Sequence, residues 1–220
     1  MRGLFVTGTG TEIGKTAVAS VIAHNLAAGG EKVAVFKPAL SGLDDPAEPD
    51  HELLRRASGS KQSDDEIAPY RFGPAVSPHF AAEIEGVNID PATILTAARK
   101  AGKAGTLVCE GVGGLLVPLT WRYLVRDFAR DLGLPLIVVA SPSLGTINHT
   151  LLTLEAARAV GLHPVAVVLN PWPDEPSRLE LDNERTVGVL GRILVERLPH
   201  IDPSAPDTWP ALKVPLGVRG

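Results

Sequence analysis

A glycine-rich loop between an apolar segment and an apolar-periodic helix constrains the fold of this chain most strongly. Residues 6–16 read Val-Thr-Gly-Thr-Gly-Thr-Glu-Ile-Gly-Lys-Thr and directly follow the β-type residues 4–6. In such a loop successive backbone N–H groups point inward, and the next helix adds the positive end of its dipole. Lys15 would supply a mobile cation for the β- and γ-phosphates, and the Thr16 hydroxyl would ligate Mg²⁺. The sequence predicts a P-loop that binds a nucleoside triphosphate.

The loop is a longer variant of the usual phosphate-binding template. The template G-x-x-x-x-G-K-[ST] would need glycine at Thr9, whereas Gly8 stands one position too early. A simple turn is the alternative for any glycine-rich run. Gly-Lys-Thr at the mouth of a helix that follows an N-terminal strand is much rarer than such a turn, and it favours the phosphate site.

Composition indicates one α/β domain without a nucleic-acid or membrane partner. The 220 residues suffice for a substantial core, and the net charge of −4 is unlike the basic excess of nucleic-acid binders. Cys109 is the single cysteine, which suits a reducing compartment. Few residues precede the P-loop, and the longest apolar runs are far too short to cross a bilayer. We expect a cytoplasmic, single P-loop α/β domain over residues 1–220, with an irregular, loosely packed tail over 201–220.

Alternating strand and helix patterns predict a doubly wound, mainly parallel sheet with helices on both faces. Helical patterns follow the P-loop and cover residues 50–57, 91–100 and 147–160. The expected strands are nearly continuous apolar runs, as in sheets covered on both sides; they span residues 4–6, 33–36, 106–109, 136–140, 165–169 and a short last one at 187–190. The acidic stretch 42–49 and the proline-rich stretch 69–78 interrupt this pattern. Both are expected to be ligand-contacting loops at the carboxyl ends of the strands.

Charged residues follow two of the expected strands. Lys37 ends the second strand beside the P-loop, where burying its charge would be costly without an anion, and this favours a cation on the transferring phosphoryl group. Glu110 ends the third strand in the Walker-B arrangement, with its carboxylate facing Mg²⁺. A surface lysine and a capping glutamate are the respective alternatives. Cys109 points to the opposite side and is interpreted as a core residue.

Other polar residues keep two interpretations on local pattern alone. Asp50 could cap the short helix that it begins, and Ser41 could bind a substrate carboxylate or stabilise a turn. Asn170 could contact a nucleobase edge or cap a turn. His79 and His149 lack metal-ligand spacing, and a hydrogen-bonded structural histidine is the alternative interpretation of each.

The motifs taken together resemble the dethiobiotin synthase family of biotin biosynthesis. The resemblance runs from residue 5 to about residue 190 and includes the longer P-loop, which is the family's own form. The other ordered motifs are Lys37-Pro38 with Ser41-Gly42, Ser77-Pro78-His79, Glu110-Gly111-Val112-Gly113-Gly114 and Leu144-Gly145-Thr146-Ile147-Asn148-His149. One departure is Val112, which replaces the alanine usual in the Glu-Gly-Ala-Gly-Gly motif.

The resemblance implies an ATP- and Mg²⁺-dependent cyclo-ligase. CO₂ or bicarbonate and 7,8-diaminopelargonic acid would form a carbamate, ATP would phosphorylate it, and the second amine would close the cyclic urea of dethiobiotin. The products would be dethiobiotin, ADP and phosphate. The enzyme would be a homodimer with its sites at the interface.

The resemblance also assigns residues by position. The metal would be held by Thr16, Asp50 and Glu110, and catalysis would depend on Lys37, Lys15 and Thr11. Nucleotide would be bound by Glu12, Ile13, Gly14, Lys15, Thr16, Ala17 and Asn170, the last at the adenine. Substrate would contact Ser41, Gly113 and Gly114, together with Leu144, Gly145, Thr146, Ile147 and Asn148 of the other subunit.

Three other functions compete with this hypothesis. A partitioning-type switch ATPase would carry an extra lysine near Thr9 and Gly10, and often a basic amphipathic helix, which residues 202–220 do not resemble. A cobyrinic-acid-type amide synthase would need a glutaminase domain with a nucleophilic cysteine. A nucleotide-binding protein without turnover is disfavoured by Lys15, Lys37 and Glu110.

Overall fold

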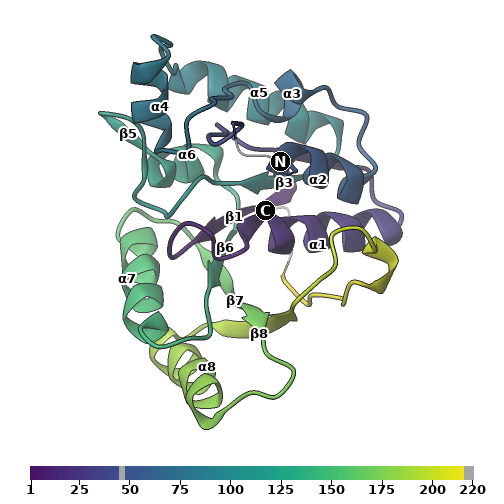
Figure 1. Ribbon diagram of the computed structural model, residues 1–220, viewed down its shortest axis with the longest axis vertical. Helices are drawn as coiled ribbons and strands as arrows, with labels where there is room; N and C mark the ends of the chain where they lie inside the picture. Colours follow the sequence, from purple (N-terminus) through teal and green to yellow (C-terminus); the bar gives the residue numbers. More distant parts are fainter. Residues whose placement is uncertain (45–47, 216–220) are drawn as a thin grey trace.

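A six-stranded parallel sheet forms the centre of the molecule, in the strand order β2-β3-β1-β6-β7-β8 (Figure 1). The computed structural model describes residues 1–44 and 48–215. The sheet comprises β1 (Gly3–Gly8), β2 (Val33–Phe36), β3 (Thr106–Glu110), β6 (Leu136–Ala140), β7 (Pro164–Trp172) and β8 (Leu194–Pro199). A separate antiparallel hairpin pairs β4 (Pro118–Thr120) with β5 (Tyr123–Leu124).

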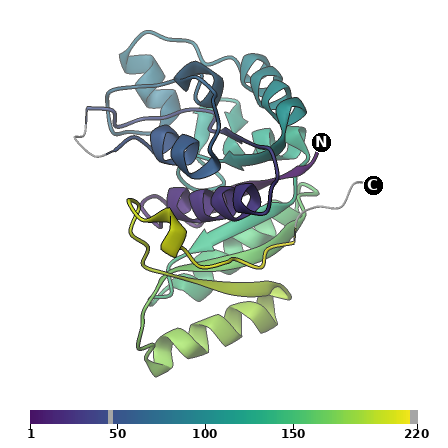
Figure 2. The ribbon, with the colours of Figure 1, turned by 90° about the vertical axis from the view of Figure 1, so that its right-hand side faces the viewer.

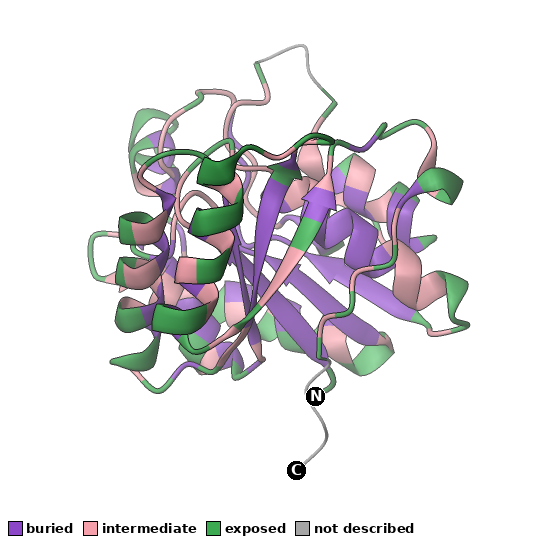
Figure 3. Ribbon diagram, turned by 90° about the horizontal axis from the view of Figure 1, so that it is seen from below, coloured by how far each residue is buried: buried purple, intermediate pink, exposed green. Residues whose placement is uncertain are grey.

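Helices cover both faces of the sheet, which confirms the doubly wound α/β fold. One face packs against α1 (Lys15–Ala28), α2 (Asp50–Ser58) and α3 (Asp64–Ile67). The other face packs against α4 (Pro78–Ile84), α5 (Pro91–Ala104), α6 (Val125–Leu132), α7 (Thr146–Arg158) and α8 (Arg178–Gly191). Figure 3 shows most strands buried between helices whose outer sides are exposed, while the edge strand β8 is partly exposed.

The continuous apolar runs of the strands have a simple physical reason. Successive side chains of a strand point to opposite faces, so Leu4 and Val6 enter one core while Phe5 enters the other. Phe5 packs edge-on against Phe128 of α6, with ring centroids 5.7 Å apart. Because both faces are covered, every position of β1 is buried.

The strand expected at residues 187–190 is wrong, because these residues form the last turns of α8. Asn183, Val187 and Gly191 are buried at intervals of four, which is a helical spacing, while Val189 and Leu190 are exposed. The helix starts at a capping box in which Ser177 and Glu180 satisfy each other's backbone N–H groups. The final strand of the sheet is β8, which follows α8.

The C-terminal tail is mostly exposed over the residues described there, but two of its side chains are packed into the core. Residues 201–215 contain one short 3₁₀ turn, Pro206–Thr208, but Ile201 and Trp209 are buried. Trp209 contacts His24 of α1 edge-on, and the Leu212 N–H donates to the Asn25 side chain. Figure 2 shows this segment lying alongside α1. Buried apolar side chains therefore hold the tail against the core. Residues 216–220 lie outside the described ranges.

The carboxyl ends of β1, β2 and β3 meet at one edge of the sheet and position the candidate site. Parallel pairing aligns Val6 with Glu110, and Phe36 with Cys109. The P-loop, Lys37 and Glu110 therefore emerge beside one another. In the described part of the chain, no helix combines the length and apolarity needed to cross a membrane.

Candidate active site

The P-loop connects β1 to α1, and there is no room for a side chain at Gly14. Gly14 has a φ of 79°, and a Cβ there would lie 1.9 Å from Nδ2 of Asn170. Only glycine fits both the left-handed conformation and this contact. No side chain caps α1 among the described residues, so its first N–H groups stay free for an anion.

Lys15 begins α1 and turns back over the P-loop. Its Nζ donates a hydrogen bond of 2.8 Å to the carbonyl of Gly10, and the side chain is buried. Burial lowers the pKa of Lys15, against the attraction of Glu110. The position is the one predicted for the phosphate-binding lysine.

A buried ion cluster lies next to the P-loop. The Lys37 ammonium is 2.5 Å from Oδ2 of Asp50 and 2.6 Å from Oε1 of Glu110. Thr16 donates its hydroxyl to the same Oε1 at 3.0 Å. Lys37 is 3% exposed and Glu110 is fully buried, so the surface-lysine and capping alternatives for these residues do not hold. The structure thus brings together four of the predicted site residues from three elements and the end of β2.

The charges in this cluster stabilise one another. Burial alone would lower the pKa of Lys37, but the carboxylates of Glu110 and Asp50 outweigh it and raise that pKa. Burial alone would raise the pKa of Asp50, but the Lys37 ammonium holds it below the usual range. Burial raises the pKa of Glu110, with Lys37 opposing the rise. Two carboxylates share one ammonium, which leaves the cluster one negative charge in excess.

The donor set of the cluster fits Mg²⁺ bound together with phosphate. Oε2 of Glu110 is buried and has no hydrogen-bond partner among the described residues. Mg²⁺ typically takes one or two carboxylates and completes its octahedron with water and substrate phosphates. No cluster of three or more His, Cys, Asp or Glu side chains suited to a metal occurs over residues 1–44 and 48–215. A site built from Thr16, Asp50 and Glu110 would therefore depend on nucleotide oxygens.

A cleft of about 700 Å³ opens above the cluster. Thr11, Glu12 and Lys15 line its P-loop side, and Ser41 and Gly113, two residues predicted to contact substrate, line other parts of it. Gly114 instead lies against the P-loop backbone, since a Cβ there would be 3.6 Å from the carbonyl of Gly8. The cleft joins the phosphate-binding and substrate-facing residues in one space.

The two predicted ligand loops form one wall of this cleft. Backbone hydrogen bonds join them, from the Gly42 N–H to the Pro74 carbonyl and from the Leu43 N–H to the Phe72 carbonyl. Leu43, Pro49, Ala75 and Val76 line the cleft between them. Residues 45–47 of the first loop lie outside the described ranges. Both loops contact the cleft, and their contribution is mostly apolar.

The predicted segment 144–148 and the predicted residue Asn170 lie outside this cleft. In the described chain, residues 144–148 do not line this cleft; Leu144 is 85% exposed just before α7. Asn170 is buried, and its Nδ2 donates to the carbonyl of Ile13 at 3.0 Å. Asn170 therefore supports the P-loop backbone directly, whatever it contacts in a nucleotide.

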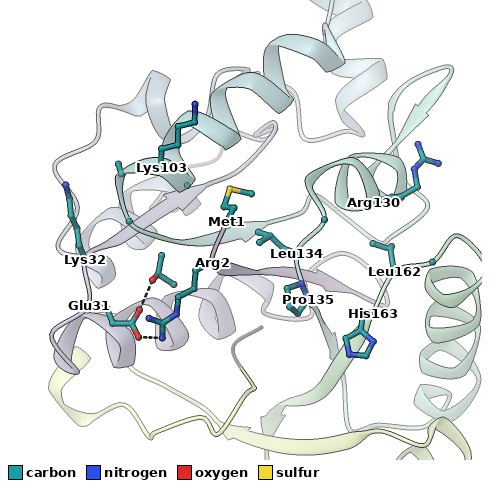
Figure 4. A pocket seen from close by; sticks show the side chains of 16 residues that line it. Met1, Arg2, Glu31, Lys32, Lys103, Arg130, Leu134, Pro135, Leu162 and His163 are labelled. Atoms are coloured by element: carbon teal, nitrogen blue, oxygen red, sulfur yellow. Dashed lines mark hydrogen bonds and ion pairs between the residues drawn. The ribbon is translucent and has the colours of Figure 1, made fainter. Parts of the chain in front are cut away.

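A second, larger cleft of about 900 Å³ lies at the amino ends of the strands (Figure 4). Arg2, Lys32, Lys103 and Arg130 line it, and Arg2 pairs with Glu31 at 2.6 Å. Glu31 also accepts a hydrogen bond from the Thr106 hydroxyl. These charged groups are distributed around the rim and do not converge on one point (Figure 4).

Comparisons with known proteins decide between the competing families. The family described as an AAA domain matches residues 2–205. An ATP-dependent dethiobiotin synthetase BioD of Anaeromyxobacter dehalogenans (strain 2CP-1) is 47% identical over 80% of this chain and 81% of its own length. The protein of the same name from Bacillus subtilis (strain 168) is 39% identical over 86% of this chain and 84% of its own. The chain belongs to the ATP-dependent dethiobiotin synthetase family.

Membership in the dethiobiotin synthetase family makes the chain an ATP-dependent ligase of biotin biosynthesis, as the sequence motifs predict. A ParA family ATPase from Chlorobium tepidum TLS has a similar structure, with a TM-score of 0.57 and 16% identity over 94% of this chain and 88% of that one. At this identity the likeness concerns the fold alone. The ParA family ATPase thus shares the architecture, and the sequence places the chain with the dethiobiotin synthetases.

Sequence reasoning missed several residues around this dethiobiotin synthetase cleft. Val117 and Val76 line it without any polar signal of their own. His79 forms a 3.0 Å hydrogen bond with the Ser77 hydroxyl and packs edge-on against Trp121, at 4.7 Å between ring centroids, which fits the hydrogen-bonded structural histidine that the sequence allowed. Residues 77–79 could have been recognised as the start of α4, since serine followed by proline is a typical helix start.

Proposed function

We propose that this chain catalyses the ATP- and Mg²⁺-dependent ring closure of 7,8-diaminopelargonic acid with CO₂ to dethiobiotin, ADP and phosphate. The buried cluster of Lys37, Asp50, Glu110 and Thr16 beside a P-loop is the observation that carries the proposal. It combines a cation for a transferring phosphoryl group with carboxylates for a metal, inside a cleft large enough for a small diamine and a triphosphate.

The reaction needs positioning and charge neutralisation rather than a protein nucleophile. CO₂ adds to one amine to give a carbamate, whose oxygen takes the γ-phosphoryl group of ATP as ADP leaves. The second amine attacks the resulting mixed anhydride, closes the urea ring and expels phosphate. The buried Cys109, whose thiol pKa is raised by burial, is consistent with a mechanism without a thiolate.

Each predicted residue has a role in this proposal. Thr16, Asp50 and Glu110 hold Mg²⁺, which neutralises charge on the phosphates when bound. Thr11, Lys15 and Lys37 hold the phosphates and the developing negative charge, and the P-loop backbone binds nucleotide through Glu12, Ile13, Gly14 and Ala17. Asn170 contacts the adenine from the side of Ile13, where its amide is held.

Substrate binding in the proposal requires a second copy of the chain. Ser41 and Gly113 face the diamine, and residues Leu144, Gly145, Thr146, Ile147 and Asn148 of the other subunit bind its carboxylate. The exposed apolar side chains of Leu116, Leu144 and Leu152 support burial against another subunit. We propose a homodimer of single P-loop domains, working in the cytoplasm, where the single free cysteine stays reduced.

Product analysis tests the proposal directly. The protein is incubated with ATP, Mg²⁺ and bicarbonate, with and without diaminopelargonic acid, while phosphate is measured and the organic product is identified by mass. We expect phosphate release that depends on the diamine and matches dethiobiotin formed. Phosphate release that is indifferent to the diamine would overturn the proposal in favour of a switch ATPase.

A further inference from the structure

We propose that Lys37 is a displaceable counter-ion. Its ammonium and the divalent cation compete for the same carboxylate oxygens, and the phosphates of ATP attract the ammonium away from these oxygens so that the cation can bind. The inference rests on the proposed Mg²⁺ site and assigns to Lys37 a task before phosphoryl transfer. It predicts that metal and nucleotide bind with strong mutual cooperativity. It also predicts that Lys37 is the cause of that cooperativity.

The oxygen atoms that a metal would use are already engaged by Lys37. Its Nζ lies 2.5 Å from Oδ2 of Asp50 and 2.6 Å from Oε1 of Glu110, between the two carboxylates. Oε1 also accepts the hydrogen bond of Thr16, the hydroxyl that the proposal gives to the metal. A divalent cation at these oxygens would face an ammonium at close range in a buried site, where repulsion is poorly screened.

Lys37 cannot leave this position without another anion. Its side chain is nearly fully buried, and an unpaired buried ammonium is energetically costly. The cleft lined by both Lys37 and Lys15 is the place where a triphosphate would supply that anion. The flexible four-carbon stem of a lysine allows its ammonium to move from carboxylates to phosphate. The phosphates of the nucleotide therefore provide an anion that pairs with the Lys37 ammonium, and they also provide additional ligands for the metal.

The carboxylates need a cation whether or not Lys37 is present. Glu110 is fully buried, and its Oε2 has no partner in the described ranges. Replacing Lys37 with a neutral side chain would leave two carboxylates side by side without a counter-charge. Apart from protonation and the nearby Lys15 ammonium, a divalent metal ion would be the species able to neutralise both carboxylates, so the stability of the variant at neutral pH should become more dependent on metal.

Metal titration of the full chain tests this mechanism without measuring turnover. Mn²⁺, as a probe for Mg²⁺, is titrated calorimetrically into wild type and Lys37→Gln, each with and without a non-hydrolysable ATP analogue. Without the analogue we expect Lys37→Gln to bind Mn²⁺ roughly 10-fold more tightly than wild type or better; the analogue should tighten binding by a similar factor in wild type and by much less in the variant. Equal Mn²⁺ affinity of the two proteins without the analogue would overturn the proposal.

Thermal unfolding gives a second readout and covers a folding defect of the variant. Mn²⁺ should raise the Tm of Lys37→Gln much more than that of wild type. If the variant is unfolded without metal, folding on addition of Mn²⁺ is the expected result, and failure to fold at saturating Mn²⁺ contradicts the proposal.

Two control variants separate the possible failures. Lys15→Gln removes a lysine of the same cleft whose hydrogen bond goes to a backbone carbonyl and which acts on the carboxylates only through its charge, so it should gain much less Mn²⁺ affinity without nucleotide than Lys37→Gln. If Lys15→Gln gains as much Mn²⁺ affinity as Lys37→Gln, the effect comes from the overall charge of the cleft, and the proposed competition for the carboxylate oxygens is refuted. Glu110→Gln should lose Mn²⁺ binding in the presence of the analogue. Unchanged binding in Glu110→Gln would refute the metal site itself.

Discussion

The two ends of the central sheet both carry clefts lined by cations, but they use those cations differently. At the carboxyl edge the ammonium of Lys37 is buried and converges with Asp50 and Glu110. At the amino edge the cleft is larger, about 900 Å³ against about 700 Å³, yet the Arg2 side chain is 42% exposed. Burial and convergence, rather than volume or the number of charges, distinguish the candidate active site.

The contrast follows from the direction of the chain in a parallel α/β fold. The helix α1 starts at the carboxyl edge and presents free N–H groups there, whereas α5 and α6 end at the amino edge with their carbonyl groups. Lys103 and Arg130 lie in the last turns of those two helices, where cations complement the helix dipole. The amino-edge cations therefore have a local structural explanation.

The largest effect expected from this contrast is on turnover at the carboxyl edge. Lys37→Gln should lower kcat by roughly 10²–10³-fold, the cost of removing one preorganised charge at a phosphoryl-transfer site. Dethiobiotin formation at saturating ATP and Mg²⁺ is the measurement, with circular dichroism as the check on folding. A folded variant with near-normal kcat would remove Lys37 from the chemistry.

The same two edges should differ in stability. In buffer without divalent metal, Lys37→Gln should lower the free energy of unfolding by about 3 kcal/mol, because it leaves Glu110 as an uncompensated buried charge. Arg2→Gln breaks an exposed pair with Glu31 and should cost less than about 1 kcal/mol. Urea unfolding of both variants makes the comparison, and equal losses would remove the distinction between the edges.

Metal dependence should respond to Glu110 next. Glu110→Gln should raise the Mg²⁺ concentration needed for half-maximal activity by roughly 10–100-fold, since one carboxylate ligand is lost. The activity is followed as a function of free Mg²⁺ at fixed ATP. An unchanged Mg²⁺ titration would return Glu110 to a purely structural role.

Acid should lower the free energy of unfolding, because the contribution of Asp50 at the carboxyl edge is lost when its carboxylate is protonated. Its pKa is lower in the folded protein than the ordinary value of 3.8, so its stabilising effect is complete above that value and is lost as pH falls through the folded pKa. Asp50→Asn should be less stable than wild type at neutral pH, and the two should converge in acid. Urea unfolding between neutral pH and about pH 3 checks this; a constant difference would contradict it.

The smallest effect is expected from the amino-edge lysines. The double variant Lys32→Gln, Lys103→Gln should keep kcat/KM for ATP within about twofold of wild type, because neither residue contacts the proposed site and surface substitutions usually have small effects. A tenfold loss of kcat/KM would show that the amino-edge lysines influence the reaction, which would contradict the distinction drawn between the two edges.

Features encoded in short, continuous segments could be predicted from the sequence. The first five strands of the sheet lie where the apolar runs indicated, and the P-loop, Lys37 and Glu110 are where their positions at strand ends placed them. Family membership likewise followed from ordered motifs. These signals are local, because a parallel strand buried on both faces must be apolar throughout.

Features that depend on contacts between distant segments could not be predicted. The apolar run at 187–190 suits either a strand or a helix, and the capping box at Ser177 and Glu180 was the overlooked signal for α8. The local sequence around Asp50 also suits a helix cap, and only the folded structure shows its carboxylate accepting a hydrogen bond from Lys37. The proline-rich tail has no periodicity, yet Trp209 finds a place against α1.

The packing of that tail against α1 has a practical consequence for anyone who shortens or tags the protein. Trp209 donates to the carbonyl of Asp202 and packs on the helix whose first residue is Lys15. Deleting residues from 201 onward would remove two buried side chains, Ile201 and Trp209, from the core that α1 shares. A truncation chosen only because this stretch lacks regular structure would therefore take away part of the packing of the helix that follows the P-loop.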